Sequence, residues 1–170
     1  MYEFSPKPHR IREKVWMSIC LFMGVLAYGF GQILSYPILY QLFSVVMLAL
    51  AVLITVRYLL RDYLYRVELS ENGSEDLTVI ETVGKRRTVV CRVSVREIVN
   101  ILPATEIKER QVLRAWQKKG IYRYTPLMRS KSSLFLEIFD EEKTYFLEIY
   151  ADSDLILLLK ELKKQYLSNE

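Results

Sequence analysis

The chain has 170 residues, of which 51% are hydrophobic, and its formal net charge is +4. This composition is too apolar for one average soluble domain unless the apolar residues are concentrated in one part of the chain. They are concentrated: the 42 residues from Val15 to Val56 include no Asp, Glu, Lys or Arg, whereas 61–170 carry nineteen Lys/Arg and eighteen Asp/Glu. The sequence therefore predicts a membrane segment and one further domain, and it excludes a second soluble domain.

The uncharged stretch is long enough for two membrane-spanning helices joined by a very short turn. We predict a transmembrane hairpin over 15–60, with helices at about 15–35 and 37–60. At 1.5 Å per residue, each helix covers a hydrocarbon layer of about 30 Å. Pro37 disfavours helix at the residue before it and can itself open the second helix. A cleaved signal peptide and a helix pair inside a soluble protein are the alternatives.

Basic residues set the expected orientation, because they flank the hairpin on both outer sides and are absent from its turn. They are Lys7, Arg10, Arg12 and Lys14 before the first helix, and Arg57, Arg61 and Arg66 after the second. Positive residues favour the cytoplasmic side. We therefore expect a cytoplasmic basic segment over 1–14, both termini in the cytoplasm, and a multi-pass protein of the cell membrane.

Small residues recur on one face of the first predicted helix, at spacings of four, three and four. They are Cys20, Gly24, Ala27 and Gly31. Such a stripe lets two helix backbones approach closely. It favours packing within the hairpin, with formation of a homo-oligomer along the same face as the alternative. Because no ionisable residue falls at mid-membrane, an ion pathway or proton relay finds no support.

Beyond position 61, short β-like segments alternate with turn signals. They predict a three-strand meander, a fourth strand that Pro103 ends, a helix over 105–119, three further strands, and a C-terminal helix capped by Asp152 or Asp154. The predicted strands are Tyr65–Ser70, Leu77–Val83, Arg86–Val93, Glu97–Leu102, Ile121–Thr125, Leu134–Phe139 and Thr144–Tyr150.

Seven strands followed by an amphipathic helix is the order of a pleckstrin-homology-like barrel. With Tyr65-Arg66-Val67, Gly84-Lys85-Arg86-Arg87 and Ile121-Tyr122-Arg123-Tyr124 in the expected places, the chain resembles the bacterial membrane-anchored pleckstrin-homology-like proteins, in which this domain follows a two-helix hairpin. The resemblance is one of organisation over nearly the whole chain. It implies a mainly β (α+β) barrel with a capping helix over 61–170 and a tethered binding or scaffolding role, and it carries over no catalytic residue.

The residue inventory argues against an enzyme. His9 is the only histidine and lies in the N-terminal segment, so the predicted domain lacks histidine for acid–base catalysis or for a Cys/His metal cluster. Neither a GxxxxGK[ST] nor a GxGxxG phosphate-binding loop occurs. We therefore expect no enzymatic activity, no cofactor and no metal.

Charge is unevenly distributed within the predicted domain: residues 85–131 carry thirteen Lys/Arg and three Asp/Glu. Basic groups near an anionic leaflet bind its headgroups. The candidate contacts to anionic lipid headgroups or to a protein partner are Lys85, Arg86, Arg87, Arg114, Trp116, Lys118 and Lys119. The alternative is that acidic residues from interleaved strands neutralise these charges. Nucleic acid is not expected, because no nucleic-acid-binding motif occurs and the domain is nearly neutral.

The leading hypothesis is thus a non-enzymatic membrane module that binds a protein partner or anionic headgroups at the cytoplasmic face. The rival hypothesis is an accessory or regulatory subunit of a larger membrane enzyme or transporter, which would pack through the hairpin.

Overall fold

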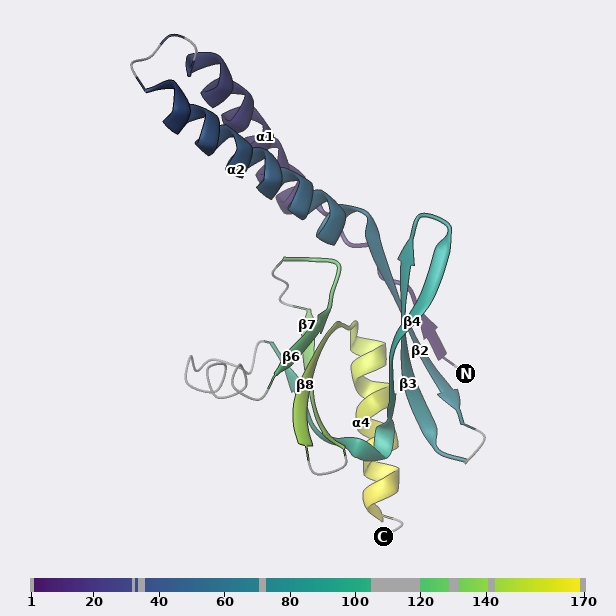
Figure 1. The fold of residues 1–170 in the computed structure, drawn as a ribbon. Helices are drawn as coiled ribbons and strands as arrows, with labels where there is room; N and C mark the ends of the chain where they lie inside the picture. Colours follow the sequence, from purple (N-terminus) through teal and green to yellow (C-terminus); the bar gives the residue numbers. More distant parts are fainter. Residues whose placement is uncertain are drawn as a thin grey trace. The chain divides into compact units, whose positions relative to one another are not determined.

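A computed structural model describes residues 2–31, 33, 36–70, 73–104, 120–128, 132–140 and 143–168 (Figure 1). The chain divides into two units. We call Pro8–Asp62 the helical hairpin and Met1–Lys7 together with Tyr63–Glu170 the β domain.

The helical hairpin consists of α1 (Ile11–Phe30) and α2 (Pro37–Ile54), which continues as a π-helical turn, η1 (Thr55–Leu59). Both helices are long and apolar enough to span a membrane. Pro37 opens α2 as predicted. However, α1 begins at Ile11 rather than at Val15, because charged residues end an apolar run without ending a helix.

The β domain contains all seven predicted strands and one more, in two four-stranded sheets (Figure 1). The first sheet has the order β1-β2-β3-β4, with β1 (Tyr2–Phe4), β2 (Arg61–Leu69), β3 (Glu75–Val83) and β4 (Arg86–Ser94). The second has the order β5-β7-β8-β6, with β5 (Ile98–Pro103), β6 (Ile121–Tyr124), β7 (Ser133–Asp140) and β8 (Lys143–Tyr150). The predicted helix over 105–119 lies outside the described residues.

The described strands do not close into the single barrel that the sequence predicted. A 3-10 turn, η2 (Val95–Glu97), redirects the chain after β4, and β5 pairs with β7 instead of continuing the first sheet. Glu97 therefore belongs to this turn rather than to the fourth predicted strand, whereas Pro103, expected to break the pairing, is the last residue of β5, opposite Leu134. The coarser prediction, two apolar helices followed by an α+β domain, is confirmed.

The C-terminal helix α4 (Ser153–Ser168) lies beside both sheets and packs with them in one hydrophobic core (Figure 1). Asp152 caps it, since the backbone N–H of Leu155 donates to Asp152 Oδ1 at 2.9 Å. Leu155 and Leu159 are fully buried against the first sheet, for example Leu77, and the second, for example Leu147. The predicted cap and apolar face of this helix are both confirmed.

Strand β1 was not predicted, and it ties the start of the chain to the β domain. It pairs antiparallel with β2, with Tyr2 opposite Val67 and Phe4 opposite Tyr65. The Phe4 ring stacks on Tyr65 and Tyr150 at centroid distances of 6.2 and 6.4 Å. Because β1 precedes the helical hairpin and β2 follows it, the hairpin is inserted between two neighbouring strands of one sheet.

Candidate functional site

The turn between β3 and β4 carries three of the basic residues that the sequence predicted as ligand contacts. Val83 lies opposite Arg86, which leaves Gly84 and Lys85 as a two-residue loop. Gly84 has a φ of +61°, the positive value that the tight primed turns of β-hairpins require at this position. The sequence therefore folds here into a narrow hairpin end with Lys85 at its point.

Both faces of this hairpin end are open to solvent. Lys85, Arg86 and Arg87 are all exposed, although neighbouring strand residues point to opposite faces of a sheet. Val83 and Val89 are exposed as well, by 44% and 58%. We call these five residues the basic tip. It combines three cations with two apolar side chains.

Two other basic residues of 85–131, Arg92 and Arg123, pair with acidic residues from distant segments, as the alternative hypothesis expected. Arg92 pairs with Glu68 at 3.1 Å and with Asp76 at 3.4 Å, and Arg123 pairs with Glu148 at 3.3 Å. In contrast, Lys85, Arg86 and Arg87 form no ion pair with any described residue. The positive charge of the domain is thus available to a ligand at the tip.

The other predicted contacts cannot be placed beside the tip. Arg114, Trp116, Lys118 and Lys119 lie outside the described residues, so their contribution stays a prediction.

The small residues of α1 lie against α2 within the helical hairpin. Cys20, Gly24, Ala27 and Gly31 are all buried. A Cβ on Gly24 would come 3.1 Å from Leu48 Cγ, which is tighter than an ordinary contact, so a larger residue would displace the Leu48 side chain. The approach also lets Ser44 Oγ donate a hydrogen bond of 2.8 Å to the Gly24 carbonyl. The stripe is therefore occupied by α2.

Arg10 closes the base of the helical hairpin, a role that sequence reasoning missed. Its guanidinium donates to the carbonyls of Leu59 at 2.7 Å and Arg61 at 2.9 Å, and it pairs with Asp62. A cation that binds the last carbonyls of a helix satisfies acceptors that have no intrahelical donor. The sequence presented Arg10 only as one of several positive charges, because these acceptors are backbone atoms about 50 positions away.

A polar hollow of about 550 Å³ lies in the β domain, where β4 leads into η2. Its lining combines Asp76, Glu97 and Asp140 with Arg92, Arg96, Tyr145 and three serines. Burial, followed by the nearby Asp140, raises the pKa of Glu97, and burial raises the pKa of Tyr145 to about 12. Within the described part of the chain, no group of three His, Cys, Asp or Glu residues could hold a metal ion.

No family model, no curated protein and no solved structure matches this chain.

Proposed function

We propose that this chain is a non-enzymatic, membrane-tethered module with a pleckstrin-homology-like β domain, whose basic tip faces anionic lipid headgroups on the cytoplasmic side. The observation that carries this proposal is the exposure of Lys85, Arg86 and Arg87 on one turn, without an ion pair to a described residue. The exposed Val83 and Val89 fit the same surface, because apolar side chains beside cations can enter the headgroup boundary.

Chain connectivity supports this assignment of the tip. β2 and β3 are neighbouring nine-residue strands joined by the short turn after Leu69, so β3 ends beside the start of β2. The tip that follows β3 therefore lies at the end of the sheet where the chain arrives from the hairpin. Tyr63 comes four positions after Leu59, the last helical residue, and four residues span at most about 14 Å.

The β1–β2 pairing supports a hairpin whose two outer ends lie on one side of the membrane. Tyr2 and Val67 could not pair if a membrane separated them. Two spans satisfy this condition and one span does not. The basic residues at both ends of the hairpin then favour the cytoplasmic side.

The expected strength of the contact between the basic tip and the lipid is enough to orient the β domain but too weak to recruit a free domain to the membrane. Each basic group near an anionic leaflet contributes on the order of 1 kcal/mol. The three cations of the tip together would then contribute about 3 kcal/mol, which is a weak attachment for a free domain. Because the helical hairpin already anchors the chain, this energy would hold the β domain in one orientation.

A fluorescent label on the tip of the full chain tests the proposal. An environment-sensitive dye is attached at Thr88→Cys, with Cys20→Ala and Cys91→Ala as background, in phosphatidylcholine nanodiscs with or without phosphatidylglycerol. We expect a blue shift that requires phosphatidylglycerol, weakens with salt, and is lost on charge reversal of Lys85, Arg86 and Arg87 to Glu. The absence of a shift at every lipid composition would contradict the proposal.

The matched control reverses three other exposed cations of the β domain to Glu: Lys143, Lys160 and Lys164. It changes the net charge by the same amount and should retain the blue shift. An equal loss in both triple variants would show a response to net charge rather than to the tip.

A protein ligand is the second candidate, and the polar hollow favours it. The hollow includes Ser94 at the end of β4, whereas the basic tip includes Arg86 at the start of the same strand. A tip on the lipid surface would thus leave the hollow open to a soluble partner. Charge reversal of Asp140 to Lys should weaken such a partner without affecting the dye on the tip.

A further inference from the structure

Two hollows at the start of α1 share the residues Ile11, Lys14 and Ser18. One has a volume of about 760 Å³ and follows α1 as far as Val25, and the other, of about 610 Å³, lies at the base of the helical hairpin and reaches Leu59. The two hollows adjoin at these three residues on the helical hairpin, and together they are treated as one groove. We call it the α1 groove.

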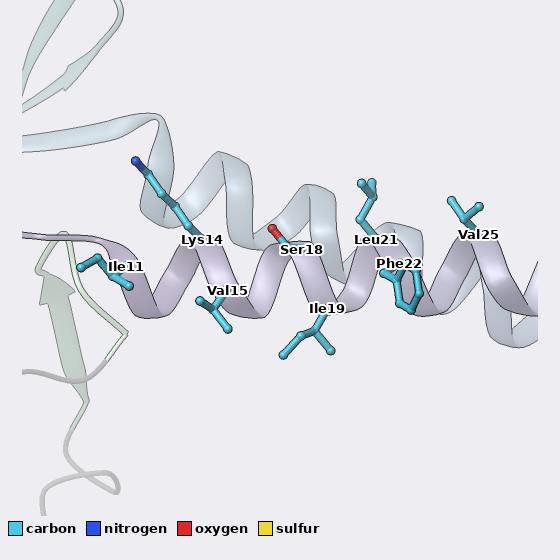
Figure 2. Close-up of a pocket in the computed structure, with 8 residues that line it drawn as sticks. All are labelled: Ile11, Lys14, Val15, Ser18, Ile19, Leu21, Phe22 and Val25. Atoms are coloured by element: carbon cyan, nitrogen blue, oxygen red, sulfur yellow. The ribbon is translucent and has the colours of Figure 1, made fainter.

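The long part of the α1 groove is apolar and faces away from α2. Figure 2 shows Lys14 near one end of this row of side chains and Val25 at the other. Val15, Ser18 and Phe22 are spaced by three and four positions, so they share one helix face, opposite the buried Cys20 and Gly24. Ser18 is the small residue among bulky neighbours on this face, which leaves room there for an apolar chain.

The short part of the α1 groove adds basic and polar side chains to an apolar lining. His9, Arg10 and Lys14 line it together with Ser18. The guanidinium of Arg10 is already bound to the Leu59 and Arg61 carbonyls and to Asp62. Lys14 is therefore the cation that both parts of the groove can offer to a ligand.

The length of the α1 groove matches one leaflet of a bilayer. From Lys14 to Val25 the helix rises about 17 Å. Half of the hydrocarbon core of a bilayer is about 15 Å thick. A ligand with a charged head at Lys14 and an apolar chain that reaches Val25 thus has the dimensions of one phospholipid.

We propose that the α1 groove binds a single phospholipid with a net anionic headgroup. This binding requires that the hairpin spans the membrane, as proposed above, but it does not require that the basic tip contacts lipid. The phosphate lies at Lys14 and His9, and one acyl chain follows Val15, Ser18 and Phe22. A zwitterionic phospholipid brings a second cation to Lys14 and gains less there. The groove therefore selects by headgroup charge, whereas an ordinary lipid-facing helix surface accepts either lipid.

The test places a tryptophan in the groove and bromine atoms on one lipid at a time. The chain has two tryptophans, so Phe22→Trp is made in full-length protein that carries Trp16→Phe and Trp116→Phe. Nanodiscs with equal amounts of phosphatidylglycerol and phosphatidylcholine carry brominated acyl chains on one lipid or on the other. We expect quenching to be stronger when the bromines are on phosphatidylglycerol, with about a fivefold preference over its bulk share. Equal quenching in the two preparations would overturn the proposal.

Matched variants locate the effect. Lys14→Gln should abolish the preference for phosphatidylglycerol, whereas Arg12→Gln should retain it, because Arg12 is also exposed on the same turn but lines neither part of the groove. Replacement of Lys85, Arg86 and Arg87 by Gln should also leave it unchanged, which separates this site from the basic tip. Loss of the preference in either of these two controls would contradict the claim that the preference arises in the α1 groove.

A second measurement removes the dependence on Phe22→Trp. The chain with its natural tryptophans is released from mixed-lipid nanodiscs, and its retained lipid is identified by native mass spectrometry. One retained phosphatidylglycerol per chain, lost in Lys14→Gln, is the expected result. Retention of both lipids in their bulk ratio would overturn the proposal.

Discussion

The helical hairpin exposes large apolar side chains on its surface, whereas the β domain buries them in its core. In the hairpin, Phe22 and Leu42 are more than 60% exposed, and small residues such as Gly24 and Ala51 are buried between the helices. In the β domain, Leu77 and Phe146 are fully buried. Water drives large apolar groups together, whereas lipid does not, so helices in lipid associate through close backbone packing and polar contacts. The comparison teaches that the two units are built for different solvents.

The two units also use hydrogen bonds differently. In the β domain, the buried Tyr65 hydroxyl donates to the Tyr124 carbonyl at 2.6 Å and accepts from the Tyr150 N–H at 3.1 Å, which joins the two sheets. Burial raises the pKa of this phenol far above its usual range. In the hairpin, the bond from Ser44 to the Gly24 carbonyl depends on the close approach of the helices.

The largest expected effect comes from making the same truncation in both units. Leu77→Ala should lower the free energy of unfolding of the β domain by about 2 to 5 kcal/mol, because it leaves a cavity in a packed core. Leu42→Ala, on the outer surface of the hairpin, should change stability by less than about 0.5 kcal/mol. Urea titration of the full chain in nanodiscs, followed by circular dichroism of the β domain, measures the first, and the mole fraction of SDS that separates α1 from α2 measures the second. Similar losses would refute the difference in solvent.

Tyr65→Phe isolates the hydrogen bonds between the sheets. It leaves the Tyr124 carbonyl and the Tyr150 N–H without the hydroxyl, and we expect a loss of about 1 to 3 kcal/mol in the same titration. Tyr122→Phe, a like change at an exposed residue, should alter stability by less than about 0.5 kcal/mol. Equal effects would remove the assigned role of Tyr65.

Gly24→Leu tests close packing in the hairpin. The added side chain meets Leu48, and we expect a loss of about 1 to 3 kcal/mol in helix association. Gly29→Leu makes the same change on the same helix where a Cβ meets nothing within 4 Å, so it should leave association unchanged. The measurement is the mole fraction of SDS that separates the helices. A shift in both variants would point to helix propensity instead of packing.

The smallest effect concerns Glu97 in the polar hollow. Because its pKa is raised in the folded state, the folded chain binds this proton more tightly than the unfolded chain, and stability falls as pH rises through the folded pKa. Glu97→Gln should therefore stabilise the β domain at neutral pH and lose this advantage at acidic pH. Glu161→Gln, at an exposed position of α4, should show no such pH dependence. Parallel pH profiles of stability for the two variants would contradict a raised pKa of Glu97 in the folded chain.

Local patterns predicted most elements of the fold and the basic part of the site. Gly73 and Gly84 have positive φ values between strands that the sequence predicted, and Lys85, Arg86 and Arg87 are exposed at one of these turns. These features depend on neighbours in the chain, which a sequence shows directly.

Long-range pairing accounts for what the sequence did not reveal. β1 has three residues, and its partner β2 lies beyond the whole hairpin, so no turn signal connects the two. The parallel pairing of β6 with β8 and the separation into two sheets likewise depend on contacts between distant segments. For the same reason, Arg10 was predicted only as a charge, although it binds carbonyls at the other end of the hairpin.

The insertion of the hairpin between β1 and β2 sets an order for biogenesis. During synthesis, Tyr2–Phe4 are made before the hairpin but find their partner only after both helices of the hairpin have been made, since Phe4 pairs with Tyr65. Until then the edge of β2 does not exist, and in the proposed topology the N-terminal segment stays on the side of the membrane where β2 emerges. Completion of the first sheet is therefore a late event, which follows synthesis of both helices of the hairpin. A C-terminal fragment that begins after the hairpin would lack one strand of its own sheet.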